Sequence, residues 1–419
     1  MPELLSVDTA LEQILNGITA LEPEHMELAD SLGRVLAEDI DADIDIPPFP
    51  NSSMDGFAVH AVSLKGASAE SPVQLTVVGD IPAGIVPNIQ VEAGQAARIM
   101  TGAQMPVGAD AVIPVESTNA VWTPGGSDPL PRKIEVFRSL RAGDYVRPAG
   151  EDMAIGTRIL SAGRVLYPAD IGVLAALGRS LIKVVRRPKV VILSTGDELV
   201  EVNEPLTPGK IRNTNSYTLA ALVATYGAIP IRIPTARDTL EDVRRRFEEA
   251  LDQQPDVILS SAGVSVGAFD AVRSVIEELG AITFWRVNLR PGKPLAFGNI
   301  RGVPFFGLPG NPVSAMVTFD VFVRPMLLRM GQRPETIHTI TASVGEDIPS
   351  DGRRSYLRVK LSNQTGRWVA TLTGTQSSGA LSSMVQADGL LIIPEGHTQV
   401  NKGTELTVRL LTDLVSEPH

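Results

Sequence analysis

The chain has 419 residues, of which 43% are hydrophobic, and a formal net charge of −11. This length predicts about two to four domains, and the acidic balance disfavours broad binding to nucleic acid or to anionic membranes, although it allows a local basic pocket. The sequence has no cysteine, which excludes disulfides, thiolate metal sites and thiol nucleophiles.

The N-terminal part is predicted to be a helix followed by a β-rich segment. Apolar residues at helical spacing over residues 7–18 predict an amphipathic helix that Ser6 caps. Prolines within 47–50 then enforce an extended path. Short β-like runs between glycine and proline turns predict a β-rich domain. Its expected strands lie at 57–59, 73–78, 97–100, 111–115 and 133–137.

A second short helix is predicted at residues 167–177, where Gly178 ends it. We expect the stretch 145–184 to pack against the N-terminal helix. The β-rich segment would then be an insertion into one split domain.

From residue 188 onwards, buried-strand runs alternate with helical segments. The strands are expected at 189–193, 229–233 and 256–259, and the helices at 215–226, 239–251 and up to residue 279. This alternation predicts a parallel α/β sheet with right-handed crossovers, whose functional loops gather at the carboxyl ends of the strands. The last part of the chain returns to β character and predicts a small β-barrel or sandwich. Its strands are expected at 354–361, 368–372, 390–393 and 405–411.

The expected architecture is therefore multidomain α/β plus β. The domains are expected at 1–47 with 146–184 (a split N-terminal domain), 48–145 (the β-rich insertion domain), 185–331 (the α/β domain) and 332–419 (the C-terminal β-barrel domain).

Five scattered histidines show no paired spacing typical of a zinc site, so a bound metal should be a hard cation with oxygen ligands. The first residues lack the basic and apolar segments of a signal peptide, and no apolar run approaches the ~20 residues that span a bilayer. We therefore expect a cytoplasmic protein.

Two polar loops follow predicted strands. Residues 194–198 (STGDE) place backbone amides where they can face an anion, beside carboxylates that suit a divalent cation. Residues 260–267 form a glycine-containing loop before a helix, where free amides and the helix dipole favour phosphate. Neither a Walker A motif nor GxGxxG is present. From the residues alone, solvated turns remain an alternative, as does an ordinary first-turn role for Asp270.

A basic cluster and a proline-rich turn complete the candidate ligand-binding segments. Arg286, Arg290 and Lys293 lie close together, and the Pro-Gly-Lys-Pro turn points Lys293 outward. Such cations suit phosphate or an oxyanion such as molybdate, unless the loop is simply a solvated charged turn. Asn311 can cap a helix with Pro312 at its first position, which can also be purely structural.

Several motifs occur along the chain in a fixed order: SMDGFAV (53–59), MTGAQMP (100–106), AGED (149–152), STGDEL (194–199), AGVSVG (262–267), RPGKP with LAFG (290–298) and LPGNPVSA (308–315). Together they closely resemble the MoeA family of molybdopterin molybdenumtransferases, which is related to the E domain of gephyrin. The resemblance implies four domains, one of them a MogA-like α/β domain, in an elongated homodimer. It implies an active cleft between the α/β domain of one subunit and the SMDG-bearing domain of the other.

The resemblance also implies a reaction and a set of residues. Molybdenum from molybdate would enter adenylylated molybdopterin, with Mg²⁺ as cofactor and AMP as a product. The family's catalytic positions match Asp55, Thr101, Asp152, Glu198, Asp238 and Asp270, of which Asp238 and Asp270 are the implied metal ligands. Its substrate-binding positions match Ser194, Thr195, Gly196, Asp197, Gly263, Val264, Ser265, Gly267, Arg286, Arg290, Lys293, Pro309 and Asn311.

Two residues depart from the family pattern: Ala262 replaces a glycine, and Ala268 stands where an acid is common. These departures leave a non-catalytic, gephyrin-like binding or scaffold protein as one alternative. A molybdopterin adenylyltransferase is another, because that related enzyme shares the α/β domain, whereas the missing GxGxxG disfavours a dehydrogenase. The expected partners are the small-molecule substrates, a second copy of the chain, the molybdopterin adenylyltransferase and recipient molybdoenzymes, with no nucleic acid and no membrane.

Overall fold

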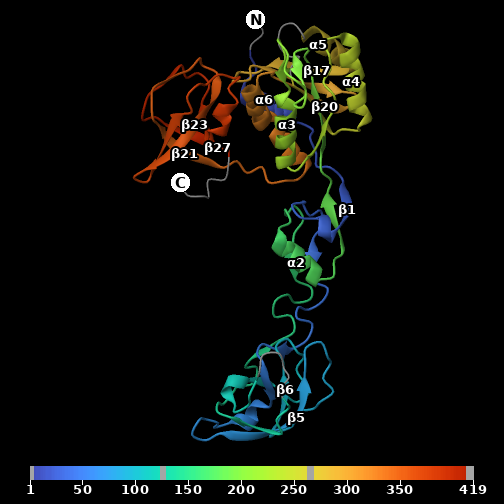
Figure 1. Ribbon diagram of the computed structural model, residues 1–419, viewed down its shortest axis with the longest axis vertical. Coiled ribbons are helices and arrows are strands. Elements are labelled where there is room, and N and C mark those ends of the chain that lie inside the picture. The colour runs from blue at the N-terminus through green and yellow to red at the C-terminus, as the bar shows by residue number, and fades with distance from the viewer. Residues whose placement is uncertain (1–3, 123–128, 262–268, 412–419) are drawn as a thin grey trace. The chain divides into compact units, whose positions relative to one another are not determined.

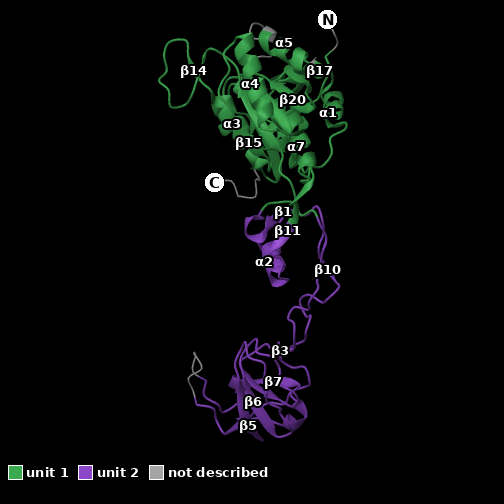
Figure 2. Cartoon of the chain, turned by 90° about the vertical axis from the view of Figure 1, so that its right-hand side faces the viewer, with its two compact units in different colours: residues 1–25, 33–37, 183–419 green, residues 26–32, 38–182 purple. Residues whose placement is uncertain are grey.

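The computed structural model describes residues 4–122, 129–261 and 269–411, without the side chains of Phe269, Asp270 and Trp285. The chain divides into two compact units, shown in Figure 2. The first, called the core unit here, comprises residues 1–25, 33–37 and 183–419. The second, the insertion unit, comprises residues 26–32 and 38–182. The two-stranded sheet of β1 (Pro23–Glu27) and β11 (Leu181–Val185) lies where the chain passes between them.

A six-stranded sheet forms the centre of the core unit (Figure 1). In spatial order its strands are β15 (Ile229–Arg232), β12 (Lys189–Ser194), β16 (Val257–Ser261), β20 (Val303–Leu308), β19 (Pro294–Ile300) and β17 (Gly280–Arg286). The first four are parallel, which confirms the predicted α/β sheet. Towards the other edge of the sheet, β19 runs antiparallel to both of its neighbours, β20 and β17. Only Arg301 and Gly302, both at positive φ, connect β19 to β20, and so short a turn joins antiparallel strands.

Helices cover both faces of this sheet. They are α3 (Thr214–Thr225), α4 (Leu240–Asp252), α5 (Phe269–Leu279), α6 (Pro312–Thr318), the π-helical turn η4 (Phe319–Val323) and α7 (Arg324–Met330). Along β12, Val190 and Ile192 join the apolar cluster that contains residues of α3, α6 and α7. Val191 and Leu193 join the cluster that contains residues of α4 and α5. Burial on both faces explains why β12 reads as an unbroken apolar run.

The N-terminal helix α1 (Val7–Leu15) begins as predicted, because the Ser6 hydroxyl accepts a hydrogen bond from the Thr9 amide at 3.1 Å. Its buried residues Val7, Ala10 and Ile14 belong to the core that α3, α6 and α7 share. The expected packing of this helix against residues 145–184 is therefore wrong. Its apolar face is already used by the core unit.

The C-terminal strands form the predicted β-barrel. They are β21 (Thr339–Val344), β23 (Arg354–Gln364), β24 (Arg367–Leu372), β25 (Gly389–Ile393) and β27 (Glu405–Leu410). The barrel closes because β23 pairs with both β24 and β25. The strand β18 (Leu289–Arg290) adds to β23 from outside the barrel. Shorter elements are β13 (Leu199–Val200), β14 (Ile211–Arg212), β22 (Ile348–Pro349), α8 (Ser382–Val385) and β26 (Gln399–Val400).

The insertion unit has the predicted β-rich character. Its main sheet, in spatial order, is β7 (Ala111–Pro114), β4 (Gly56–Val59), β6 (Gln95–Ile99), β5 (Val73–Ile81) and β8 (Lys133–Val136). Its other elements are η1 (Leu28–Asp30), β2 (Ile40–Asp41), β3 (Asn51–Ser52), η2 (Ala61–Leu64), η3 (Val115–Ser117), β9 (Val146–Arg147), β10 (Arg158–Leu160) and α2 (Pro168–Ala176). In the described parts of both units, no helix is long and apolar enough to cross a membrane.

Candidate active site

Three of the predicted ligand-binding loops begin at one edge of the central sheet. Ser194 ends β12 and pairs with Ser261, which ends β16. Ser261 in turn pairs with Leu308, which ends β20. Residues 195–198, the segment after Ser261 and residues 309–311 therefore leave three adjacent parallel strands at the same level. Most of the second loop, with the predicted Gly263, Val264, Ser265 and Gly267, lies outside the described residues.

The loop after β12 is tied to its neighbours by backbone hydrogen bonds. The Thr195 amide donates to the Ser261 carbonyl at 3.3 Å, and the Gly196 amide donates to the Ala236 carbonyl at 3.2 Å. Gly196 has φ = 145°, and a Cβ there would lie 2.6–2.8 Å from the Glu198 carboxyl group. Glycine is therefore required at this position. Among the described residues, the buried Thr195 hydroxyl has no hydrogen-bond partner.

Asp197 and Asp238 come together across 41 residues of sequence. The Asp197 amide donates to Asp238 Oδ2 at 3.3 Å, and the Asp238 amide donates to Asp197 Oδ1 at 3.4 Å. Both residues are exposed. Within the described ranges no group of three His, Asp or Glu residues has metal-binding geometry. Mg²⁺ commonly uses one or two carboxylates together with water and substrate phosphate, so this donor pair is compatible with it.

Of the two implied metal ligands, only Asp238 can be placed in this way. Asp270 lies in the first turn of α5, and its side chain is outside the described residues.

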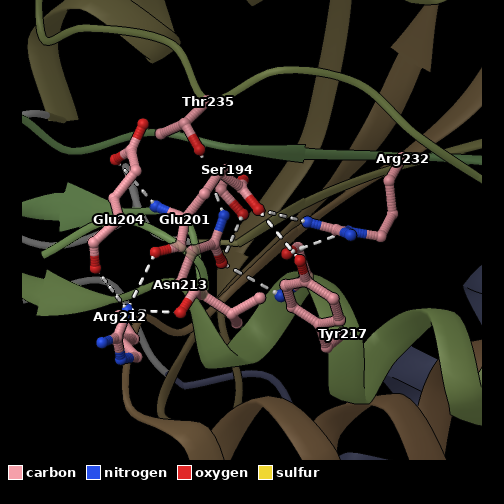
Figure 3. Close-up of polar contacts among 10 residues, drawn as sticks. Ser194, Glu201, Glu204, Arg212, Asn213, Tyr217, Arg232 and Thr235 are labelled. Atoms are coloured by element: carbon pink, nitrogen blue, oxygen red, sulfur yellow. Dashed lines mark hydrogen bonds and ion pairs between the residues drawn. The ribbon is translucent and has the colours of Figure 1, made fainter.

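Asn213, the N-cap residue of α3, connects the end of β12 to the segment after β15 (Figure 3). Its Oδ1 accepts from the Ser216 amide at 3.2 Å and from the Ser194 hydroxyl at 3.3 Å. Its Nδ2 donates to the Thr235 hydroxyl at 3.1 Å. The start of α3 is thereby fixed to the ends of β12 and β15.

Next to Asn213, a second polar cluster holds the segment that follows β13 (Figure 3). The Arg232 guanidinium lies over the Tyr217 ring, 3.6 Å from its centroid, and both side chains contact Glu201 Oε2 at 3.0 Å. Arg212 donates to the carbonyls of Glu201, Val202 and Glu204, at 3.1, 2.6 and 2.8 Å. No local sequence pattern indicates this cluster, since its members are spread over 32 residues.

The predicted basic cluster extends from Arg286, the last residue of β17, to Lys293, which directly precedes β19. Arg286 and Lys293 are exposed, whereas Arg290 is half-buried and its Nη1 lies 3.9 Å from Asp351 Oδ2. A hydrogen bond from Arg353 lowers the pKa of the Asp351 carboxyl group, and the charge of Arg290 adds to this effect. Arg286 and Lys293 are therefore exposed to solvent, while Asp351 partly neutralises the charge of Arg290.

Arg358, a fully buried arginine on β23, was not predicted from the sequence. It donates to the Ser383 hydroxyl at 3.1 Å and to the Thr375 and Ser377 carbonyls at 3.3 and 3.0 Å. Its Nη1 has no hydrogen-bond partner within the part of the chain that the structure describes. Burial lowers the pKa of Arg358, and the charge of Arg290 lowers it further. An unpaired buried cation near a second arginine is suited to an anion.

The loop that carries the carbonyl partners of Arg358 also contacts the segment after β20. The Ser378 carbonyl accepts from the Val313 amide, in the first turn of α6, at 3.1 Å. Asn311 occupies the N-cap position of α6, but its side chain forms no capping bond. The predicted side-chain cap is therefore wrong. The Asn311 carbonyl accepts from the Ala315 amide instead, and the exposed side chain is not needed by the helix. Pro309 is buried.

In the insertion unit the structure joins two predicted catalytic residues. Asp55 Oδ1 accepts from the Thr101 amide at 2.7 Å and from the Thr101 hydroxyl at 2.8 Å. Asp152 is exposed, and its amide donates to the Ile46 carbonyl at 3.0 Å. The SMDG and MTGA motifs thus form one local site, presented at the end of the main sheet by β4 and β6.

These features define a multidomain α/β protein in which adjacent parallel strands end together in polar segments. Three family models match the chain: the MoeA N-terminal region (domain I and II) at residues 5–178, the probable molybdopterin binding domain at 191–329 and the MoeA C-terminal region (domain IV) at 341–411. The chain therefore belongs to the MoeA family.

Relatives match over nearly the whole chain. Molybdopterin molybdenumtransferase 2 of Mycobacterium tuberculosis is 38% identical over 407 residues, covering 94% of this chain and 96% of that protein. Molybdopterin molybdenumtransferase of Bacillus subtilis is 36% identical over 413 residues, covering 98% and 94%. A crystal structure of the molybdopterin biosynthesis MoeA protein from Pyrococcus horikoshii has a TM-score of 0.82 at 34% identity, covering 98% of this chain and 100% of that chain.

Proposed function

We propose that this protein is a molybdopterin molybdenumtransferase that inserts molybdenum from molybdate into adenylylated molybdopterin, with release of AMP, during molybdenum cofactor biosynthesis. The observation that carries the proposal is the convergence of three family loops at Ser194, Ser261 and Leu308, on adjacent strand ends. The full-length relatives with this named activity support it.

Two kinds of group at the strand edge bind the two substrates. The amide-rich loops 194–198 and 260–267 bind the nucleotide and its phosphate. The cations Arg286, Arg290 and Lys293, together with buried Arg358, bind molybdate. Molybdenum is finally held by the two sulfurs of the pterin, so the protein needs no cysteine ligand. The complete absence of cysteine fits this arrangement.

Mg²⁺ would be held by Asp238 and Asp270, with Asp197 beside Asp238. When bound, the ion supplies Lewis-acid polarisation of the phosphoanhydride. Glu198 lies in the same loop and contributes a further carboxylate near the nucleotide.

Asp55, Thr101 and Asp152 belong to the insertion unit, and we propose that they act in trans within a homodimer. A mixed dimer of an Asp55→Ala subunit and an Asp270→Ala subunit should then regain about one intact cleft, while each parent homodimer has none. Heterodimers that form without regaining activity would contradict the shared cleft. The four-domain division at 1–47 with 146–184, 48–145, 185–331 and 332–419 is a further prediction, except that α1 packs in the core unit and not with residues 146–184. The cytoplasmic location and the protein partners are also predictions.

One assay separates the proposed reaction from adenylylation. The purified protein is given either ATP with molybdopterin, or adenylylated molybdopterin with Mg²⁺ and molybdate. We expect product only from the second mixture. Activity with the first mixture would indicate an adenylyltransferase, and inactivity with both would indicate a binding or scaffold protein. Ala262 and Ala268 would then be the first residues to examine.

A further inference from the structure

Glu395 joins three segments of the core unit that are far apart in the sequence. It follows β25 in the barrel, and 26% of its side chain is exposed. Its Oε2 accepts a hydrogen bond from Asn288 Nδ2 at 2.9 Å, and its Oε1 accepts one from the Val7 amide at 3.2 Å. Asn288 and Val7 lie 107 and 388 residues away in the chain. Each carboxylate oxygen therefore holds a different segment against the barrel.

The N-terminal segment takes part in the same junction. Val7 begins α1, whose first amides have no partner within the helix, so a carboxylate is favourable beside it. The Asp8 carboxylate accepts two hydrogen bonds from Arg354 of β23, at 2.6 and 2.7 Å. The Leu5 carbonyl accepts from the Asn288 amide at 2.8 Å. The N-terminal segment thus contacts both the barrel and Asn288.

Asn288 belongs to the segment that carries the predicted basic cluster. The Val287 amide donates to the Lys293 carbonyl at 3.1 Å, which closes this segment into a turn. Within the turn, β18 pairs with β23, the barrel strand that carries Arg358. The bond from Asn288 to Glu395 fixes the turn to the barrel at a second point. Because the Asn288 side chain is a neutral amide, this bond does not neutralise a cation.

We propose that Glu395 is a positioning residue for molybdate binding. Through Asn288 it fixes the basic turn against the barrel strand that carries Arg358. The cations of the turn and of the barrel thereby keep the spacing that one molybdate ion requires. This inference rests on the proposed function, which assigns molybdate to these cations. Glu395 acts through Asn288 and does not itself contact molybdate.

Removing either partner tests the bond between Glu395 and Asn288. Glu395→Ala, Asn288→Ala and the double variant are compared in the full-length protein. Glu346→Ala is the matched control, because it removes another barrel glutamate that accepts a backbone amide, that of Leu372 at 3.1 Å. The measurements are the half-saturating molybdate concentration and the maximal rate of AMP release, the affinity for AMP with Mg²⁺, and a melting curve.

We expect the half-saturating molybdate concentration to rise about tenfold in each single variant, since the loss of one charge-assisted hydrogen bond is of this order. The double variant should be no weaker than the single variants, because both changes remove the same bond. The maximal rate and the AMP affinity should stay at the wild-type values. Glu346→Ala should resemble the wild type in every measurement of binding and rate.

An unchanged molybdate response in Glu395→Ala would overturn the proposal, even with a lower melting temperature, because the bond would then be structural only. An equal loss of AMP affinity would also overturn it. A double variant about a hundredfold weaker would show that Glu395 does not act through Asn288, which contradicts the proposal as well. Failure of the proposed function is distinguishable, because the wild type itself would then release no AMP in response to molybdate, and that result would overturn both.

Discussion

Asp55 accepts two hydrogen bonds from Thr101, one from the backbone amide at 2.7 Å and one from the side-chain hydroxyl at 2.8 Å. Both bonds end on the same carboxylate oxygen, so the other oxygen receives nothing from Thr101. The arrangement holds an exposed carboxylate in one orientation. It explains why two motifs separated by 46 residues behave as one site.

Thr101→Val should therefore impair turnover without unfolding the insertion unit. The substitution removes the hydroxyl donor but leaves the backbone donor, so Asp55 is held less firmly. Loss of about 1 kcal/mol of hydrogen bonding predicts roughly a five- to tenfold lower rate. Thr157→Val is the control, because it removes a comparable local hydroxyl bond, to Ala154, in the same unit. Equal rates for Thr101→Val and the wild type would show that the hydroxyl does not orient Asp55.

Lys293→Ala should weaken the response to molybdate. The side chain is exposed beside Arg286 and Arg290, and its loss removes one cation and up to three donors. A charged hydrogen bond is worth roughly 1.5–3 kcal/mol, so the half-saturating molybdate concentration should rise about ten- to a hundredfold. AMP affinity and the melting temperature should change little. Lys360→Ala, at an exposed lysine of the barrel, is the control. An equal loss of AMP binding would mean that Lys293 binds the nucleotide instead.

Asp320→Ala should be strongly destabilising. Asp320 is buried in the π-helical turn, where its Oδ1 lies 2.9 Å from Arg409 of the barrel and 3.5 Å from Arg324. Burial raises the pKa of Asp320, while the two arginines oppose that shift. Removing the carboxylate leaves two buried cations unpaired, which costs about 3–5 kcal/mol. Denaturant unfolding should show this loss, whereas Asp252→Ala, at the exposed end of α4, should not. A loss below about 1 kcal/mol would show that the cluster does not stabilise the core unit.

The insertion unit should lose stability in acid through Asp80. Hydrogen bonds from Arg98, at 2.8 and 2.7 Å, lower the pKa of the Asp80 carboxyl group. The stabilisation is complete above the ordinary aspartate pKa near 4, and it is lost as the pH falls through the lowered value in the folded state. The melting-temperature difference between the wild type and Asp80→Asn should therefore be constant from pH 7 to about 5 and shrink below about pH 4. A difference that does not depend on pH would contradict this assignment.

Elements with strong local signals could be predicted from the sequence. The apolar run of β12 and the Ser6 cap are encoded within a few residues, and their positions are correct. The edge loops were predicted because functional loops follow parallel strands. Asn215 and Arg358 could not be found in this way. The side chain of Asn215 contacts Gly310, 95 residues away, and that of Arg358 contacts Ser383, 25 residues away. No local pattern identifies a buried amide or guanidinium that connects distant segments.

Local sequence patterns also did not predict which elements pack against one another. The amphipathic pattern of α1 predicts that one face of the helix is buried, but it does not identify the elements against which that face packs. The strand β19 runs antiparallel to β20 because a two-residue turn at Arg301 and Gly302 joins them. The alternation of strands and helices in the sequence does not indicate this turn.

At this site molybdate should drive the release of AMP from the adenylylated pterin. A molybdate titration of AMP release by the purified wild-type protein, supplied with adenylylated molybdopterin and Mg²⁺, tests this reaction. We expect saturable release that requires molybdate and is lost in Asp55→Ala. Release that is independent of molybdate, or no release with any divalent metal, would show that the protein does not catalyse molybdenum insertion.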